Sequence, residues 1–92
     1  MTQTYDNVFD AIEKDPAMAQ NLFIRSKLMI RLKKYIETNS LTQKSAAKLM
    51  GVTQPRISDL VRGKIDRFTI DMLVNMLVRA GIKVDLHLKD AA

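Results

Sequence analysis

The sequence has no cysteine and no tryptophan, only one histidine, and few glycines, prolines and aromatic residues. Without cysteine, disulfides and thiolate zinc sites are excluded, and a reducing cytoplasm is compatible with the chain. Aromatic residues make up 5% of the chain while hydrophobic residues make up 47%, which favours aliphatic helix packing over a β-sandwich. No apolar run is long enough to span a bilayer, and no charged-then-apolar leader opens the chain, so we expect neither membrane insertion nor secretion.

The sequence also shows no arrangement of residues that is typical of an active site. The single histidine, His87, lies far in sequence from any base or nucleophile that could act with it. The sequence shows no glycine-rich phosphate loop and no cluster of metal ligands. We therefore expect a protein that is not an enzyme and that uses no cofactor or metal. Its 92 residues allow one domain, 1–92, without room for a second core.

Positive charge is abundant, and it is concentrated in the middle of the chain. The net charge is +5, but residues 1–24 carry one base against four acids, a net of −3. Residues 25–67 carry eleven bases against three acids, a net of +8, and residues 68–92 carry three of each. A positive field over one segment suits the binding of phosphates. The alternative is an ordinary solvated surface of lysine and arginine.

Residues 41–64 predict two short helices joined by a tight turn. Thr42 is suited to cap the first helix, and Gly51 follows its last apolar residues, where a helix ends on a left-handed residue. Thr53 offers a hydroxyl to cap the second helix, and Pro55 lies in its first turn, where a missing N–H costs little. This pattern is typical of a helix-turn-helix.

Three positions in this stretch distinguish a helix-turn-helix more specifically than the pattern of two amphipathic helices does. Ala47, four residues before Gly51, is small enough for the helices to cross, and Ile57, six residues after it, is suited to fill the space between them. The spacing Ala-x3-Gly-x5-Ile, with Thr-Gln before the second helix, resembles the Cro and lambda-repressor-like family, also called the Xre family. An ordinary helical hairpin ended by a glycine is the alternative, but it explains none of the exposed polar residues on the second helix.

A recognition helix presents its first turn and outward face to the major groove, which selects the candidate base-reading residues. Gln54 is suited to pair with adenine, Arg56 with guanine or a phosphate, and Pro55 with a thymine methyl group. Asp59 either accepts from cytosine or only orients Arg56. The resemblance implies base reading at Gln54, Pro55 and Asp59 and phosphate contact at Gln43. The candidates for holding phosphates are polar or basic side chains at the helix ends and beyond: Gln43, Thr53, Ser58, Arg62, Lys64 and Arg67.

Three further segments read as helices. Asp15-Pro16 is a strong start signal for a helix that continues to about Thr38, long enough for its N-terminal half to protrude or to pack against another chain. Thr69 predicts the cap of a helix from Ile70 to about Ala80. Residues 7–12 suggest a single turn that starts within an N-terminal segment, 1–15. Together these predict an all-α, lambda-repressor-like bundle of about five helices.

The C-terminal segment, residues 82–89, alternates between apolar and polar residues, which is the period of a half-buried strand. A strand alone leaves its backbone groups unpaired, so it needs a partner. The simplest partner is the same segment of a second copy, across a twofold axis. The expected interface is its apolar face: Ile82, Val84, Leu86 and Leu88. A disordered tail and a strand folded back on its own domain are the alternatives.

The whole arrangement resembles repressor-like antitoxins of the HigA and HipB types, most of all a compact HigA-like branch. It runs from an Asn-Val-Phe opening through Leu-Thr-Gln, Gln-Pro-Arg-Ile-Ser and Arg-Gly-Lys to the alternating tail. The resemblance implies an antitoxin and autorepressor of a type II toxin–antitoxin operon. Such a protein binds a palindromic operator in double-stranded DNA as a homodimer, with a cognate toxin as candidate partner, in the cytoplasm with the nucleoid and away from membranes.

Two alternatives remain open for the function. The first is a stand-alone Xre-type repressor, phage- or plasmid-like, with no toxin. The second is a protein-interaction module whose basic face binds an acidic protein without specific DNA binding. RNA binding is less favoured, because the aromatic stacking platforms used for single strands are missing.

Overall fold

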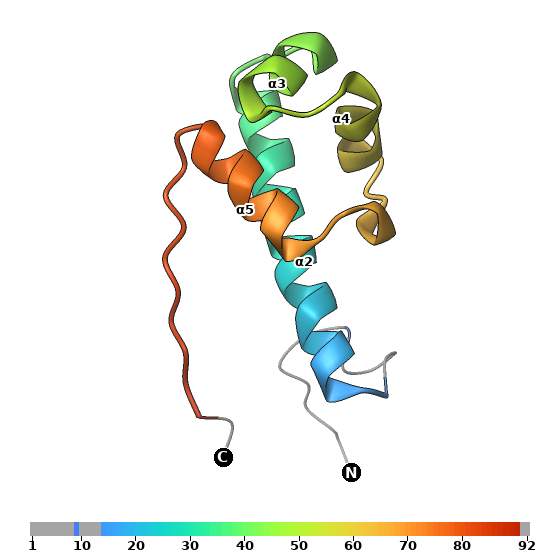
Figure 1. Ribbon diagram of the computed structural model, residues 1–92, viewed down its shortest axis with the longest axis vertical. Helices are drawn as coiled ribbons and strands as arrows, with labels where there is room; N and C mark the ends of the chain where they lie inside the picture. The colour runs from blue at the N-terminus through green and yellow to red at the C-terminus, as the bar shows by residue number, and fades with distance from the viewer. Residues whose placement is uncertain (1–8, 10–13, 91–92) are drawn as a thin grey trace.

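A long helix is the element around which the others pack. The computed structural model of the protein describes residues 9 and 14–90. Within these residues the elements are α2 (Pro16–Thr38), α3 (Gln43–Met50), α4 (Gln54–Val61), a 3-10 turn η1 (Ile65–Arg67) and α5 (Ile70–Arg79). Figure 1 shows α3, α4 and α5 gathered around the C-terminal half of α2, while its N-terminal half extends beyond them, as its length suggested.

Each α-helix begins where its capping residue predicts. In all four, a side-chain oxygen of the cap accepts a hydrogen bond from a backbone N–H of the first turn, the caps being Asp15, Thr42, Thr53 and Thr69. At α3 the bond is reciprocal, because the Ser45 hydroxyl accepts from the N–H of Thr42. A cap of this kind stabilises a helix by about 0.5–2 kcal/mol, so the local sequence sets these boundaries.

The core lies between the C-terminal half of α2 and the three shorter helices. Its largest fully buried side chains come from all four α-helices: Leu32, Met50, Ile57, Leu60, Leu73, Met76 and Leu77. Phe68, between η1 and α5, is also buried and belongs to the same cluster. The helix-turn-helix is therefore supported by α2 and α5, which restrict how α4 lies on the surface.

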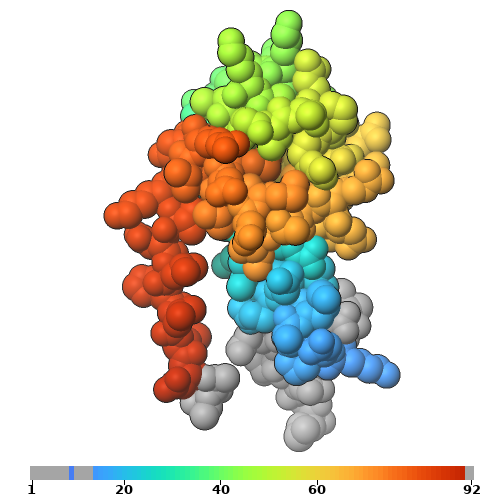
Figure 2. Space-filling model, viewed as in Figure 1, coloured from blue at the N-terminus to red at the C-terminus, as the bar shows by residue number. Residues whose placement is uncertain are grey.

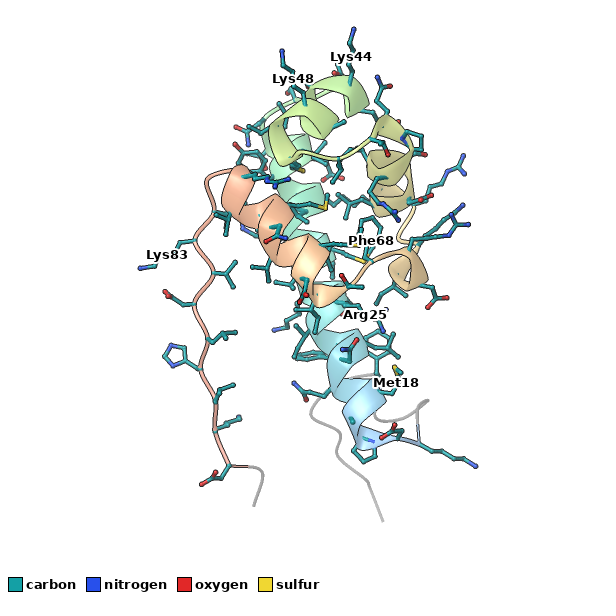
Figure 3. All side chains as sticks on the ribbon, in the orientation of Figure 1. Met18, Arg25, Lys44, Lys48, Phe68 and Lys83 are labelled. Carbon is teal, nitrogen blue, oxygen red and sulfur yellow. The ribbon has the colours of Figure 1, made fainter. Side chains whose placement is uncertain are left out.

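The short helical turn expected in the N-terminal segment falls outside the described structure. The turn predicted over residues 7–12 lies outside the described residues except for Phe9, so the count of five helices is not supported. The described part of the chain contains four α-helices and one 3-10 turn. Met18 is 44% exposed because it lies on the projecting half of α2, as Figure 3 shows.

The C-terminal residues 82–90, which we call the tail, form no strand in the described structure. The predicted strand is absent because the described residues offer no second strand for it to pair with. The tail is nevertheless extended, and in Figure 2 it stands clear of α2 over most of its length. Ile82 and Val84 are half-buried against the core, whereas Leu86 and Leu88 are 79% and 91% exposed.

An arginine of α2 holds the segment between α4 and α5, residues 62–69, which we call the connector. The Nη1 of Arg25 donates to the carbonyls of Ile65 (3.1 Å) and Phe68 (3.4 Å) in a partly buried setting. Its Nε donates to Oδ1 of Asn21 at 2.6 Å, which orients the guanidinium. Figure 3 shows Arg25 and Phe68 on the same side of the molecule. The connector is thus fixed to α2 through its backbone.

Arg25→Ala is expected to lower the free energy of unfolding by about 1.5–3 kcal/mol, because partly buried carbonyls lose a charged donor. In a domain of this size each 1 kcal/mol corresponds to a fall in Tm of about 4–8 °C. A thermal melt followed by circular dichroism measures it. The matched control is Arg31→Ala, an exposed arginine of the same helix, which should change stability by less than about 0.5 kcal/mol. Equal melting of the two variants would contradict the role of Arg25.

Candidate nucleic-acid interface

The first turn of α4 combines a fixed cap with exposed side chains. Thr53 accepts a hydrogen bond from the N–H of Arg56 (3.3 Å), and Pro55 lies in the first turn, where no intrahelical bond is lost. Ile57 is fully buried, so one face of the helix is anchored in the core. Gln54 and Pro55 are consequently exposed on the other side. These two residues of the predicted base-reading set therefore lie on the exposed face of the helix.

The turn between α3 and α4 needs glycine because of its backbone conformation. Gly51 has a φ of 70°, in the left-handed region, and its N–H donates to the carbonyl of Ala47, which ends α3. The Arg79 guanidinium of α5 lies against the same residue, with Nη1 3.5 Å from the carbonyl oxygen of Gly51. A Cβ at Gly51 would meet only the end of this exposed, flexible side chain, so the positive φ is the reason for glycine. The predicted Ala-x3-Gly geometry is therefore present.

The N-terminal end of α3 is polar and exposed. Gln43, the predicted phosphate contact, is the first residue of the helix and is exposed beside its free N–H groups. Lys44 and Lys48 are also exposed on α3 and project away from the body of the molecule in Figure 3. Their separation of four residues puts them on one face of the helix. This spacing is visible in the sequence, but neither lysine was among the predicted DNA-binding residues.

The structure places the Asp59 carboxylate beside Lys64 and Arg67, whereas the Arg56 guanidinium bonds to a backbone carbonyl. The carboxylate lies 3.8 Å from Nζ of Lys64 and 3.7 Å from Nη1 of Arg67. The Asp59 side chain is only 17% exposed, so it lies between these two cations. Each ion pair is long and partly exposed and contributes little to stability by itself. Together the two ion pairs hold Lys64 and Arg67, both predicted to bind phosphates, close to Asp59 of α4.

Arg56, predicted to reach a guanine or a phosphate, is turned toward the protein. Its Nη1 donates to the carbonyl of Arg67 at 2.7 Å, and its guanidinium carbon lies 5.6 Å from the centre of the Phe68 ring. The residue is half-buried as a result. Among the other candidates, Ser58 is half-buried, while Arg62, the residue that follows α4, is exposed.

The described residues show neither a metal-binding cluster nor a membrane-spanning helix. Residues 9 and 14–90 contain no group of three or more His, Cys, Asp or Glu side chains placed to hold a metal ion. Among the helices described there, none combines the length and the apolar character needed to cross a membrane.

Comparison with known proteins agrees with this geometry. The family model described as a helix-turn-helix domain matches residues 11–89. A solved structure assigned to the XRE family of transcriptional regulators is similar, with a TM-score of 0.73 and 25% sequence identity over 78% of this chain and 81% of that one. No curated protein sequence matches the chain. Since the family model covers most of its length, the chain belongs to the helix-turn-helix domain family.

Proposed function

We propose that the chain is a sequence-specific transcriptional regulator that places the first turn of α4 in the major groove of double-stranded DNA. The family and the XRE-family neighbour support a DNA-binding transcriptional regulator. The observation that carries the specific proposal is the exposure of Gln54 and Pro55 on a helix whose opposite face is buried. Lys64 and Arg67 lie beside that helix, where phosphates flank a groove.

Gln54→Ala is expected to weaken binding to the best DNA site by about 1–3 kcal/mol, because a paired base edge loses its partner, while binding to random DNA changes less. Lys64→Ala should instead weaken all sequences alike and lower the salt slope by about one unit. Gel shifts at several salt concentrations, on a site selected from a randomised pool and on a random duplex, measure both. Gln20→Ala, an exposed glutamine on the projecting half of α2, is the control.

Loss of the same size on both duplexes for Gln54→Ala would remove the base-reading role. An unchanged salt slope for Lys64→Ala would remove the phosphate role. Failure of the unaltered protein to bind any selected duplex would favour the alternative, a basic surface that binds an acidic protein.

We further propose that the regulator is a homodimer joined by the tails. The support is physical: Leu86 and Leu88 are among the most exposed large hydrophobic residues described, and they lie on an extended segment with no strand beside it. Leu86 and Leu88 of two copies are worth roughly 1.5–3 kcal/mol each when fully buried, a total comparable to an association cost of about 4–15 kcal/mol. The recognition helices should then lie about 34 Å apart, facing palindromic half-sites about 10 base pairs apart.

Charge complementarity narrows the registers of the paired tails to two. Opposite residues of an antiparallel pair share a face, so a twofold axis through residue 84, 85, 86 or 87 keeps the apolar face continuous. The axis through 85 sets Asp85 against Asp85, and the axis through 86 sets Lys83 against Lys89, and like charges directly opposite are destabilising. The axis through 84 sets Lys83 against Asp85 twice, and the axis through 87 sets Asp85 against Lys89 twice.

The hydrogen bonding at the start of the tail identifies its free edge. The N–H of Ile82 donates to the carbonyl of Leu77 at 2.9 Å, so the even-numbered backbone groups face the domain at that point. In an extended chain the odd-numbered groups then point to the other edge. Lys83 and Asp85 carry backbone groups on that edge, which is the edge that a second tail would use in each of these registers.

The toxin–antitoxin role remains part of the proposal, beside a stand-alone repressor. Its support is the resemblance to HigA-like antitoxins and the acidic segment 1–24, which is opposite in charge to the middle of the chain and suits a basic partner. The neighbouring gene distinguishes the two. A small basic nuclease-like or kinase-like neighbour whose product co-purifies with this chain supports the antitoxin, and the absence of such a neighbour supports a solitary regulator.

A further inference from the structure

Two arginines on different helices, one on α2 and one on α4, bind the backbone of the connector. Arg25 of α2 donates to the carbonyls of Ile65 and Phe68, and Arg56 of α4 donates to the carbonyl of Arg67. The Arg56 bond, at 2.7 Å, is short and charge-assisted, and the guanidinium also lies over the buried ring of Phe68. Three backbone carbonyls of the connector, those of Ile65, Arg67 and Phe68, are therefore bound by long side chains from outside it.

The connector carries two cations beside the recognition helix. Arg67 and Lys64 are both at least partly exposed and both lie within 4 Å of the Asp59 carboxylate. The Arg67 carbonyl is the acceptor of the Arg56 bond, so the same residue that offers a cation to solvent has its backbone fixed by α4. Residue 67 is thus held by α4 at two points, its carbonyl by Arg56 and its guanidinium by the ion pair with Asp59.

We propose that Arg56 is a positioning residue, which fixes the backbone at Arg67 so that the Arg67 cation meets the DNA backbone beside α4, and that it does not itself read a base. The proposal rests on the proposed DNA-binding function and refines it. A base contact by Arg56 requires its guanidinium to leave both the Arg67 carbonyl and the Phe68 ring. Sequence readout then falls to the exposed first turn of α4, at Gln54 and Pro55.

Arg56→Met is the first variant to test, because it keeps the apolar stem over Phe68 while removing the donor and the charge. Binding to a selected site and to random DNA should weaken by the same factor, about three- to tenfold, as expected for a backbone contact. The ratio of the two affinities should stay constant. The Tm should fall by about 4–8 °C, the shift that corresponds to one modest hydrogen bond in a domain of this size.

A double-mutant cycle with Arg67→Ala separates positioning from direct contact. If Arg56 acts through the Arg67 side chain, Arg56→Met causes no further loss of DNA affinity in the Arg67→Ala background. The fall in Tm persists there, because alanine keeps the backbone carbonyl that accepts the bond. The control is Arg62→Met, an exposed arginine that follows α4. Its effect on affinity should add to that of Arg67→Ala, and its Tm should be unchanged.

Three results would overturn the inference. A fall in the ratio of selected to random binding for Arg56→Met would show base reading. Additive losses for Arg56→Met and Arg67→Ala would show an independent phosphate contact. A lower Tm with unchanged DNA binding would show a purely structural role. Failure of the unaltered protein to bind any duplex would instead overturn the proposed function, and the Tm shift of Arg56→Met would still be measurable, so the two failures are distinguishable.

Discussion

Val84→Lys combined with Leu86→Lys is expected to convert a dimer into a folded monomer with sharply weakened operator affinity. Leu86 is 79% exposed in the single chain, so a lysine there costs the isolated domain little, whereas Val84 is half-buried against the core and its replacement lowers the stability of the monomer. In the paired tails the same two changes place four charges on the face that the dimer buries, which is strongly unfavourable. Loss of the second half-site removes an avidity gain of about 10²–10⁴. Sedimentation and a gel shift on one sample measure both effects.

The matched control for this experiment is an exchange of charges within the same segment. Lys83→Asp combined with Asp85→Lys also alters two residues of the tail, but it preserves the facing pairs in a register centred on residue 84. In that register this variant should remain dimeric and bind the operator normally, whereas Lys83→Asp alone should weaken the dimer. In the register centred on residue 87, the exchange sets a lysine against Lys89, and the dimer should weaken. If the Val84 and Leu86 double variant stays dimeric, the interface lies elsewhere, and the projecting half of α2 is the next surface to test.

Ile57→Ala is expected to have the largest effect on stability, a loss of about 2–5 kcal/mol, because a large side chain in a closed site leaves a cavity. Ile57 has no exposed surface and belongs to the core cluster with Ala47 and Met50 of α3. Domains of this kind are stable by only about 5–15 kcal/mol in total, so the loss removes a large share of the free energy of unfolding. A thermal melt followed by circular dichroism measures the loss.

DNA binding of Ile57→Ala should fall in parallel with the folded fraction, since the same side chain sets the position of α4 against α3. The control is Val78→Ala, a hydrophobic residue of α5 that is largely exposed, which should change stability by less than about 0.5 kcal/mol. A Tm of the Ile57 variant within a few degrees of the unaltered protein would show that the helix pair does not depend on this contact.

The parts of the fold that local chemistry controls were predictable from the sequence. The caps Asp15, Thr42, Thr53 and Thr69 all accept the expected hydrogen bonds, and Gly51 has the expected positive φ. The partners in these cases lie two to four residues away in the chain, so the sequence itself brings them together. The burial of Ile57 was predictable for a related reason, since helical periodicity puts it on the apolar face of α4.

The tail shows the limit of periodic patterns. Its alternation predicts a strand, and the described chain provides an extended segment that begins against the core and ends in solvent. A strand, unlike a helix, takes its hydrogen bonds from another segment, so the pattern of one segment specifies a face but not the partner. The partner proposed here, a second copy, is therefore argued from exposure and charge.

The sequence by itself determined the helices, the turn, the buried face of α4 and the concentration of positive charge in the middle of the chain. Only the tertiary structure decided which charged side chains remain available to a ligand. Arg56 bonds to a carbonyl 11 residues away and Arg25 to carbonyls 40 and 43 residues away, so neither contact follows from local spacing. The physical reason is that a charged side chain is long and flexible, and its partner is set by whichever element the packed core brings within reach.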